Sequence, residues 1–447
     1  MFSKITKRLS GMQMIAGGFF FIILIGSLLL MLPCAVKPGE SVSFMTALFT
    51  STSATCVTGL IVADTFTQWT LFGQLVILLL IQIGGLGFIT LGVTVSILLR
   101  RKIGLKERGL IRESLNIIEF RGMVRLTKRI IYGTLLFESA GAIILALCFI
   151  PKMGIAQGVY YGIFHSVSAF CNAGFDLMGR YEKFSSLTGY ANHPVVMTTV
   201  MLLIVIGGIG FIVWNDLYEH RLKIRKYSLH TKIVLTSTLT LIFGGALLFY
   251  IIEGNRLFSG MTLMEKIFNS LFCSITPRTA GFNTVDVGAM TDGGKLLTVI
   301  LMFIGGAPGS TAGGVKVTTL IVLFIFIKAT LLRTIGYNIF GRRLEDEALH
   351  KAAAVFCTNL TLAMTAVILL CGIQNFNGTD ALLECFSAVS TVGMTAGLTT
   401  KLNAASQFII ILLMYLGRVG SLSFAMSFTD KKKIAHVMQP AEKINIG

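Results

Sequence analysis

The sequence predicts an all-α integral membrane protein, built from four tandem repeats of a helix, a short pore helix and a second helix around one pore. Three features predict it: an apolar composition, eight apolar segments of membrane-spanning length, and a short segment with a glycine turn that occurs four times. Of the 447 residues, 54% are hydrophobic and 13% are charged. The mean hydropathy is +0.79. This balance indicates a chain that lies in a lipid bilayer.

Spanning a bilayer takes about 20 apolar residues. Stretches of that length with at most one charge begin near Met14, Leu71, Ile130, Pro194, Ile233, Leu296, Ala352 and Gln407. Basic residues favour the cytoplasmic side of a membrane, and most of the 38 Lys and Arg fall in residues 1–10, 100–129, 220–232, 328–351 and 430–447. We therefore expect eight transmembrane helices in a multi-pass cell-membrane protein with both termini in the cytoplasm.

The formal net charge of +17 would suggest nucleic acid as a partner of a soluble protein. Membrane topology and attraction to anionic lipid account for most of it here, so we expect the lipid bilayer as a partner and no nucleic acid. The eight cysteines lie mostly in or beside apolar segments, which argues against a disulfide or zinc framework. The six histidines are scattered, and no nucleophile stands with a base. We expect neither an enzyme nor a covalent cofactor.

Four segments of about ten residues, half the spanning length, lie between the apolar helices: 44–53, 158–169, 263–273 and 381–389. Each leads into a glycine turn, and these four glycine turns are residues 55–60, 170–175, 277–282 and 390–394. The third segment departs from the others, because it ends in Ile275-Thr276-Pro277. Non-helical backbone at membrane depth must be buried in protein or line water. The turns are therefore candidates for a pore lining.

The glycine turns suit cation conduction for three physical reasons. A ring of backbone carbonyls can replace the water around a cation. Glycine accepts a positive φ and lets backbones approach closely, and each half-helix would aim its carbonyl end, with roughly −0.5 charge, at the pore. Glycine pairs recur as well, at 84–85, 207–208 and 305–306 and, degenerate, at 417–418. For the pairs, helix packing and a pore role are equally open.

This duplication divides the chain into repeats at 1–100, 101–219, 220–332 and 333–447. Repeat two includes the basic connection 100–129, which has the composition of an amphipathic helix at the inner membrane surface or of a dock for a partner. Repeat three includes residues 305–316, with five glycines and one proline. At about 1 kcal/mol per glycine and about 3 for proline, the helix should break there and face a cavity. A kinked packing helix is the alternative.

Three charges fall inside the expected spans, at a cost of about 2.5 to 3.5 kcal/mol each at the bilayer centre. They are Glu138, Lys316 and Arg418. Arg418 stands where the second glycine of the fourth pair would be, so it could form part of a gate, brake cations or serve as a structural counter-ion. Glu138 could pair with either cation, and the sequence does not choose between them.

Acidic residues follow three of the turns, at Asp64, Asp176 and Asp286. Carboxylates at a pore mouth raise the local cation concentration, although aspartate is also common in ordinary turns. For His165 and Arg278, which also lie near the turns, core or rim roles are the expectation.

On these turns, glycine pairs and half-helices, the chain resembles the Trk/Ktr/HKT superfamily of potassium transporters over nearly its whole length, most of all the Ktr-type membrane subunit. The resemblance implies a single-chain pseudo-tetramer similar to a potassium channel. It implies that the glycines and their neighbours supply the filter carbonyls: Val57, Thr58 and Gly59; Asn172, Ala173 and Gly174; Thr279, Ala280 and Gly281; Thr391, Val392 and Gly393. Members with serine at the first glycine resemble sodium-permeable transporters, so Gly59 favours potassium.

The same resemblance implies an intramembrane gate below the filter, made by Gly305, Gly306, Ala307, Pro308, Gly309, Ser310, Thr311, Ala312, Gly313, Gly314, Lys316 and Arg418. No nucleotide-binding domain follows the last helix, so regulation should come from a cytosolic ring of nucleotide-binding subunits, with the membrane subunit a homodimer. The implied function is potassium-selective translocation in an uptake system, with potassium as substrate and sodium as a candidate activator.

Two other classes of protein remain open. One is an alternating-access, sodium-coupled cation transporter, which also uses broken helices at the midplane. Its repeats are usually inverted pairs, whereas these four run in one orientation. The other is a membrane scaffold without transport, in which changes to the turn glycines would leave ion flux intact.

Overall fold

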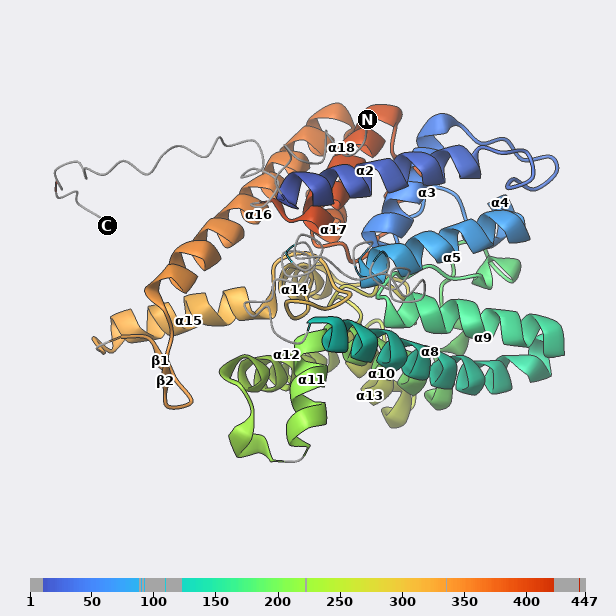
Figure 1. Cartoon of the computed structure of the whole chain (residues 1–447). Helices are drawn as coiled ribbons and strands as arrows, with labels where there is room; N and C mark the ends of the chain where they lie inside the picture. Colours follow the sequence, from blue (N-terminus) through green and yellow to red (C-terminus); the bar gives the residue numbers. More distant parts are fainter. Residues whose placement is uncertain are drawn as a thin grey trace.

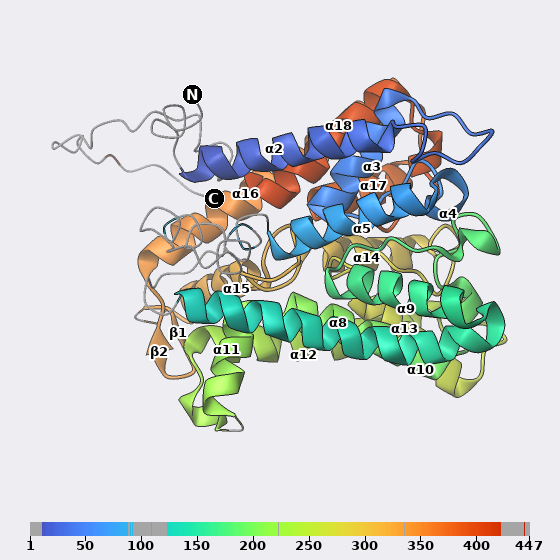
Figure 2. The same ribbon diagram turned by 45° about the vertical axis from the view of Figure 1, so that its right-hand side comes forward.

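A computed structural model of the chain describes residues 11–87, 90, 92, 109, 123–221, 223–334, 336–421 and 442. The fold is predominantly helical, and Figures 1 and 2 show the longer helices running alongside one another. Residues 1–10, most of the basic connection 100–129 and most of the chain after Ser421 lie outside the described residues. The expectations for those segments, an amphipathic surface helix and a cytoplasmic tail, therefore stay predictions.

Four helices are long and apolar enough to cross a membrane in the described part of the chain. They are α2 (Gly11–Leu30), α8 (Met123–Met153), α12 (Leu229–Glu253) and α16 (Asp346–Ile373). A shorter helix follows each of them and packs against it. These are α3 (Phe44–Cys56), α9 (Ile155–Phe170), α13 (Leu263–Ile275) and α17 (Gly378–Val389). At 12 to 16 residues, the short helices are insufficient to span a bilayer.

A second apolar segment comes after each short helix. These segments are α5 (Leu71–Leu86), α10 (Pro194–Gly208) with α11 (Phe211–His220), α14 (Asp292–Phe303) with α15 (Val317–Leu331), and α18 (Ala404–Val419). If the bent pair α10–α11 counts as one span, five spans pass the length and composition test; α5, α15 and α18 are apolar but shorter. The eight transmembrane helices expected from the sequence therefore stay a prediction.

The segment that begins at Pro194 differs from the continuous span that we expect from the sequence. Its two helices meet at an angle of 93°. Gly210, at the junction, has a φ of 95°, and the amide of Phe211 donates a hydrogen bond to the carbonyl of Gly309, 2.7 Å away. The helix thus ends where a glycine allows a positive φ and where a distant loop satisfies the first amide of α11.

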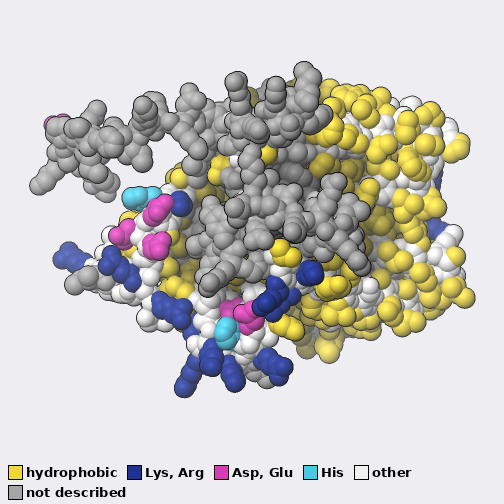
Figure 3. All heavy atoms as spheres, viewed as in Figure 1, with side chains coloured by type: hydrophobic (Ala, Val, Ile, Leu, Met, Phe, Trp, Pro, Cys, Tyr) yellow, Lys and Arg dark blue, Asp and Glu magenta, His cyan; other side chains and the backbone are white. Residues whose placement is uncertain are grey.

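The remaining described elements are short. They are α4 (Thr65–Gln68), the 3₁₀ turns η1 (Met178–Arg180), η2 (Thr188–Tyr190), η3 (Ile224–Lys226) and η4 (Thr399–Lys401), and the strands β1 (Asn338–Ile339) and β2 (Arg342–Arg343). The two strands form an antiparallel hairpin in which Asn338 lies opposite Arg343. Lys and Arg side chains gather over α11, the end of α15 and this hairpin, whereas hydrophobic side chains cover most of the opposite, right-hand part of the described surface (Figure 3).

The helices close into a ring. The second apolar segment of each unit contacts the short helix of the next: α5 contacts α9, α10 contacts α13, α14 contacts α17, and α18 contacts α3. The last contact joins the two ends of the chain, and the hydroxyl of Tyr415 donates to the carbonyl of Ala16, 2.7 Å away. The four short helices therefore surround a common centre.

A repeated contact fixes three short helices on their long helices. A serine hydroxyl of the short helix donates to a carbonyl of the long one, and a glycine three residues further along the long helix leaves room for it. The serines are Ser51, Ser166 and Ser274, whose acceptors are Ile23, Glu138 and Ile242 at 2.7, 2.7 and 2.8 Å, and the glycines are Gly26, Gly141 and Gly245. In the fourth unit, Cys385 occupies this position. It precedes Gly393 by eight residues, as Ser51 precedes Gly59.

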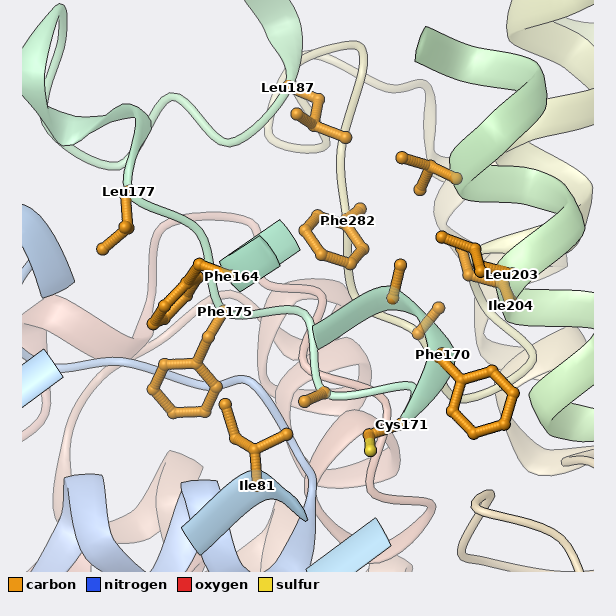
Figure 4. Close-up of a cluster of buried hydrophobic side chains, with 14 of the residues drawn as sticks. Ile81, Phe164, Phe170, Cys171, Phe175, Leu177, Leu187, Leu203, Ile204 and Phe282 are labelled. Carbon is orange, nitrogen blue, oxygen red and sulfur yellow. The ribbon is translucent and has the colours of Figure 1, made fainter. Parts of the chain in front are cut away.

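Buried apolar side chains surround the centre. The residue after each turn glycine belongs to this core: Leu60, Phe175, Phe282 and Met394, each at most 1% exposed. Figure 4 shows Phe175 beside Phe164 and Ile81, with Phe282 on the other side of the same turn. Each glycine turn is thus followed by an apolar side chain buried in the core.

Candidate functional site

The four glycine turns share one backbone conformation. Each turn glycine has a positive φ, of 92°, 69°, 81° and 93° for Gly59, Gly174, Gly281 and Gly393. The residue two positions earlier also has a positive φ: Val57, Asn172, Thr279 and Thr391, at 57°, 58°, 78° and 52°. A positive φ is uncommon outside glycine, and a β-branched residue rarely adopts it. Its occurrence at the same position of all four turns means that tertiary contacts impose one shape.

The turns meet one another in cyclic order. A Cβ added to any turn glycine would meet a carbonyl oxygen of the next turn, always that of the residue just before the next glycine. The pairs are Gly59 with Ala173, Gly174 with Ala280, Gly281 with Val392, and Gly393 with Thr58. The structure therefore brings all four predicted filter turns together as a closed ring of backbone, with no room for a side chain at the glycines.

A hydroxyl near the end of each short helix holds its turn. The hydroxyls of Ser53 and Ser387 accept hydrogen bonds from the amides of Gly59 and Gly393, at 3.0 Å each. Ser168 instead donates to the carbonyl of Phe175, 2.7 Å away. In the third turn, where the sequence departs from the pattern, Thr276 takes this part and donates to Phe282 at 2.6 Å. The four hydroxyls thus brace equivalent parts of the ring.

A cavity of about 660 Å³ opens on one side of the ring, and all four turn glycines line it. We call this cavity the vestibule. Asp176, Glu182 and Asp286 also line it, with Lys183 as the one basic side chain among its described lining residues. Asp176 lies in the loop after α9, outside the spanning helices, and burial raises the pKa of its carboxyl to about 7, with the nearby charge of Asp64 adding to the shift. The vestibule therefore places three carboxyl groups beside the ring, and that of Asp176 is mostly charged only above about pH 7.

Asp64 does not line the vestibule, unlike the other two aspartates that the sequence singles out. Its carboxylate accepts hydrogen bonds from the amides of Thr67 at 2.8 Å and Phe184 at 3.1 Å, so it joins two loops. His165 has a core role: it stacks on Tyr161 and accepts at 3.4 Å from the amide of Leu177. These residues shape the rim without facing the vestibule.

Arg278 is buried, and its guanidinium donates to the hydroxyl of Thr238 on α12, 3.2 Å away. Sequence reasoning missed Glu384, a fully buried acid of α17 that accepts from the hydroxyls of Thr395, at 2.7 Å, and Thr399. Its only sequence signal is an acidic residue within an apolar half-helix. Glu384 fixes the loop that follows the fourth glycine turn.

On the opposite side of the ring lies the glycine-rich loop, residues 305–316. The helix breaks as the sequence predicts, since α14 ends at Phe303 and α15 begins at Val317. The amides of Ala307 and Thr311 donate to the carbonyls of Gly208 and Gly207, at 2.9 and 3.3 Å. The loop is thus held against the glycine pair of α10, and the alternative of a kinked but continuous helix is wrong for the described chain.

The glycine-rich loop also packs directly beneath the turns. A Cβ on Gly313 would meet the side chain of Thr391, and one on Gly314 would lie 2.8 Å from the Cα of Ser390. The hydroxyl of Thr311 donates to the carbonyl of Phe170 at the end of α9, 3.2 Å away. A Cβ on Gly305 would also lie 3.5 Å from the side chain of Thr279, so the loop lies against residues of three of the four turns.

Two cations fix the loop through backbone carbonyls. The ammonium of Lys316 donates to the carbonyls of Ala312 and Gly313, at 2.6 and 2.9 Å. The guanidinium of Arg418 donates to Thr311 at 2.5 Å and also to the carbonyls of Gly84 and Gly85. Arg418 therefore ties the loop to the first glycine pair. Both cations line a cavity of about 200 Å³ that includes Gly309 and Gly314.

Glu138 pairs with neither cation. Its carboxylate accepts hydrogen bonds from the amide of Gln82 on α5, at 3.1 and 3.3 Å. Its backbone carbonyl also accepts from Ser166. Glu138 thus links α5, α8 and α9 behind the second turn, a structural arrangement.

The glycine pairs have a packing role in this structure. A Cβ on the first glycine of a pair would meet a carbonyl four residues before the turn glycine: Thr55 for Gly84, Phe170 for Gly207, and Val389 for Gly417. Gly305 of the third pair lies instead against its own loop, with a Cβ 2.8 Å from the carbonyl of Val315. Three pairs therefore allow an apolar helix to touch the end of a short helix.

The chain matches the family model described as TrkH, cation transport protein, over residues 10–436. It is 40% identical to the potassium/sodium uptake protein NtpJ of Enterococcus hirae, with 99% of each chain covered. It is also 40% identical to the Ktr system potassium uptake protein B of Bacillus subtilis, again with 99% of each covered. Among solved structures, the potassium transporter TrkH from Vibrio parahaemolyticus matches with a TM-score of 0.70 and 19% identity, over 93% of this chain and 85% of that one.

Proposed function

Because this chain belongs to the TrkH family of cation transport proteins, we propose that it is the potassium-translocating membrane subunit of an uptake system. The closed ring of the four glycine turns carries the proposal. In it, backbone carbonyls from Thr58, Ala173, Ala280 and Val392 stand at one level between neighbouring glycines. The relatives named above are potassium uptake proteins, which fits this assignment.

The ring has the chemistry to dehydrate a cation without fixed charge. Carbonyl oxygens replace the hydration shell, and the four short helices end at the turns, so that each directs roughly −0.5 of a charge toward the centre. On this proposal the filter consists of the three residues of each turn that end in its glycine, 57–59, 172–174, 279–281 and 391–393. Acidic groups of the vestibule supply cations to it.

The glycine-rich loop is the proposed gate. It lies directly beneath the turns, and Lys316 and Arg418 place two positive charges at the cavity on the far side. Arg418 holds the loop to the carbonyls of α5. An open path requires the loop to leave Thr391 and Ser390, and the loss of the Arg418 contacts is the step that frees it.

The finer arrangement follows from the same proposal. Four tandem repeats in a pseudo-tetramer with eight spans would have the vestibule outside and the basic end, with α11 and the β1–β2 hairpin, in the cytoplasm (Figure 3). The relative from Bacillus subtilis is named as a protein of the Ktr system. We therefore propose a homodimer that is regulated by a cytosolic nucleotide-binding ring. Sodium, named with potassium in another relative, is the proposed activator.

The test is potassium and sodium uptake in cells that lack other uptake systems, with the native chain and Gly59→Ser. The φ of Gly59 is 92°, and a Cβ there would press on the carbonyl of Ala173, so the substitution should displace a filter carbonyl and abolish the preference for potassium. Gly39→Ser is the matched control, since Gly39 has a φ of 88° with no atom near its Cβ position. Unchanged selectivity in Gly59→Ser would reject the filter.

Alternating access is distinguished by the flux itself. A sodium-coupled carrier transports a fixed number of ions per cycle, whereas a pore gives throughput that follows the electrochemical gradient. Potassium flux without sodium on either side of a proteoliposome would favour the pore. Strict dependence on a sodium gradient would favour the carrier.

A further inference from the structure

A groove of about 550 Å³ lies between α12 and α15, the helix that leads away from the glycine-rich loop. It runs from Leu241 and Val317 at one end to Lys328 and Thr334 at the other. Figure 1 shows that α15 leads to the β1–β2 hairpin at the edge of the molecule. The groove therefore reaches from the level of the loop to the basic end.

The wall of the groove is apolar despite its hydroxyl groups. Thr236, Ser237 and Thr240 each donate to a carbonyl of their own helix α12, at 2.7, 2.6 and 2.9 Å. Their hydrogen-bonding capacity as donors is therefore satisfied, and α15 adds Leu320 and Phe324 on the other side. Such a surface fits a hydrocarbon chain.

A polar cavity of about 390 Å³ adjoins the basic end of the groove, and the two share Ala329 and Thr334. Arg333, Arg343 and Asp346 line the polar cavity. The carboxylate of Asp346 lies 3.5 Å from the guanidinium of Arg343. The other two cations, Arg333 and the exposed Lys328, lie where the two cavities meet. Positive charge thus stands where the hydrocarbon part of the site ends.

We propose that this composite site binds an anionic phospholipid, with an acyl chain in the groove between α12 and α15 and its phosphate at Lys328 and Arg333. Charge complementarity selects this occupant, because a zwitterionic lipid would gain less from the two cations. Binding of the lipid itself does not depend on the proposed function, but the next step does.

The bound lipid would also act on the proposed gate. Val317 begins α15 and is also hydrogen-bonded to the loop, since its amide donates to the carbonyl of Gly306, 3.1 Å away. A chain wedged between α12 and α15 therefore sets the position of the helix to which the loop is attached. We expect occupancy of the groove to change basal potassium flux and to leave selectivity unchanged.

The test is native mass spectrometry of the purified full chain with phosphatidylglycerol or phosphatidylcholine. A double variant with Lys328→Gln and Arg333→Gln should retain phosphatidylglycerol more weakly, by about fivefold for each charge removed. Thr240→Phe should block the groove and abolish retention. Lys226→Gln, an exposed cation of η3, and Leu239→Phe, on the other side of α12, are the controls and should retain the lipid.

Three outcomes would overturn the proposal. Equal retention of both lipids, or equal retention by Thr240→Phe and Leu239→Phe, would reject the site. A change in oligomeric state in Thr240→Phe with lipid retention intact would assign the groove to a second copy of the chain. Loss of retention with unchanged flux in proteoliposomes would reject the link to the gate. Failure of the proposed function would differ from all three, since the chain would then show no selective potassium flux at any lipid composition.

Discussion

The vestibule side and the loop side of the turn ring are built on different plans. On the vestibule side, the four turns repeat one backbone conformation and each glycine faces the same carbonyl of its neighbour. On the other side, one loop from the third unit and one arginine from the fourth cover the ring. Equivalent carbonyls are needed wherever a spherical ion is to be coordinated from all sides, whereas a single movable segment is enough to close a path.

The largest effect should come from breaking the symmetric side. A Cβ on Gly393 would meet the carbonyl of Thr58 and lie 2.9 Å from the Cα of Gly59. A non-glycine residue with positive φ costs about 1–2 kcal/mol, and overpacking adds about 1–3 kcal/mol, so potassium uptake by Gly393→Ala should fall by about two orders of magnitude. The control is Gly397→Ala, because Gly397 has a φ of 85° but nothing near its Cβ position. Similar losses in both would mean that backbone strain alone matters.

The next effect should come from freeing the asymmetric side. Arg418→Gln removes charge-assisted hydrogen bonds to Thr311, Gly84 and Gly85, which contribute about 1.5–3 kcal/mol each. Because the loss of one such bond already corresponds to a factor of about ten, basal rubidium flux into proteoliposomes should rise at least tenfold, with selectivity retained. Flux at the level of the native chain would show that Arg418 does not hold the loop closed.

A smaller effect is expected at the glycine pairs, where a substitution can test whether their role is helix packing or conduction. A Cβ on Gly207 would press on the carbonyl of Phe170, whereas one on Gly208 would have only the amide of Asn172 nearby, at 3.4 Å. Gly207→Ala should destabilise the fold by about 1–3 kcal/mol and leave the selectivity of the remaining folded protein unchanged. Thermal unfolding followed by tryptophan fluorescence measures this, with Gly208→Ala as the near-neutral control. Altered selectivity in Gly207→Ala would contradict a pure packing role.

The smallest effect should be electrostatic and dependent on pH. With a pKa of about 7, the Asp176 carboxyl is mostly neutral at pH 6 and mostly charged at pH 8, so the affinity for potassium should rise over this window, by about twofold. Asp176→Asn should remove the rise, as measured by the KM of uptake at low ionic strength. Asp64→Asn, which alters a carboxylate outside the vestibule, should keep the rise but move it to lower pH, because the charge of Asp64 contributes to the raised pKa of Asp176. A rise that persists in Asp176→Asn would assign it to another group.

Local features of the sequence were sufficient to locate the turns and the helix break. Positions such as Gly59 and the interruption at 305–316 are recognisable because half-length segments and runs of glycine are themselves local signals. The departure of the third repeat was visible as Ile275-Thr276-Pro277, and the structure adds that Thr276 replaces the serine of the other turns.

Other parts of the site depend on partners that are distant in sequence. The bend between α10 and α11 needs the carbonyl of Gly309, about a hundred residues away. The recurring serine contact of Ser51, Ser166 and Ser274 with a long helix has only a weak signal, since serine and glycine are common and the spacing between them varies. Glu138 had two candidate partners by charge, but the amide of Gln82 is its partner in the structure.

The sequence by itself determined that this chain is helical and apolar and that four glycine turns follow half-length segments, because helix length, hydropathy and glycine turns depend on neighbouring residues. Only the tertiary structure decided that the turns close in the order one to four and back to one, and that Arg418 joins the loop to the first unit. The physical reason is that every residue has a backbone carbonyl, whatever its side chain, so the local sequence does not show which group a given carbonyl will meet. Which glycine it faces, and which cation it binds, are set by how distant helices pack.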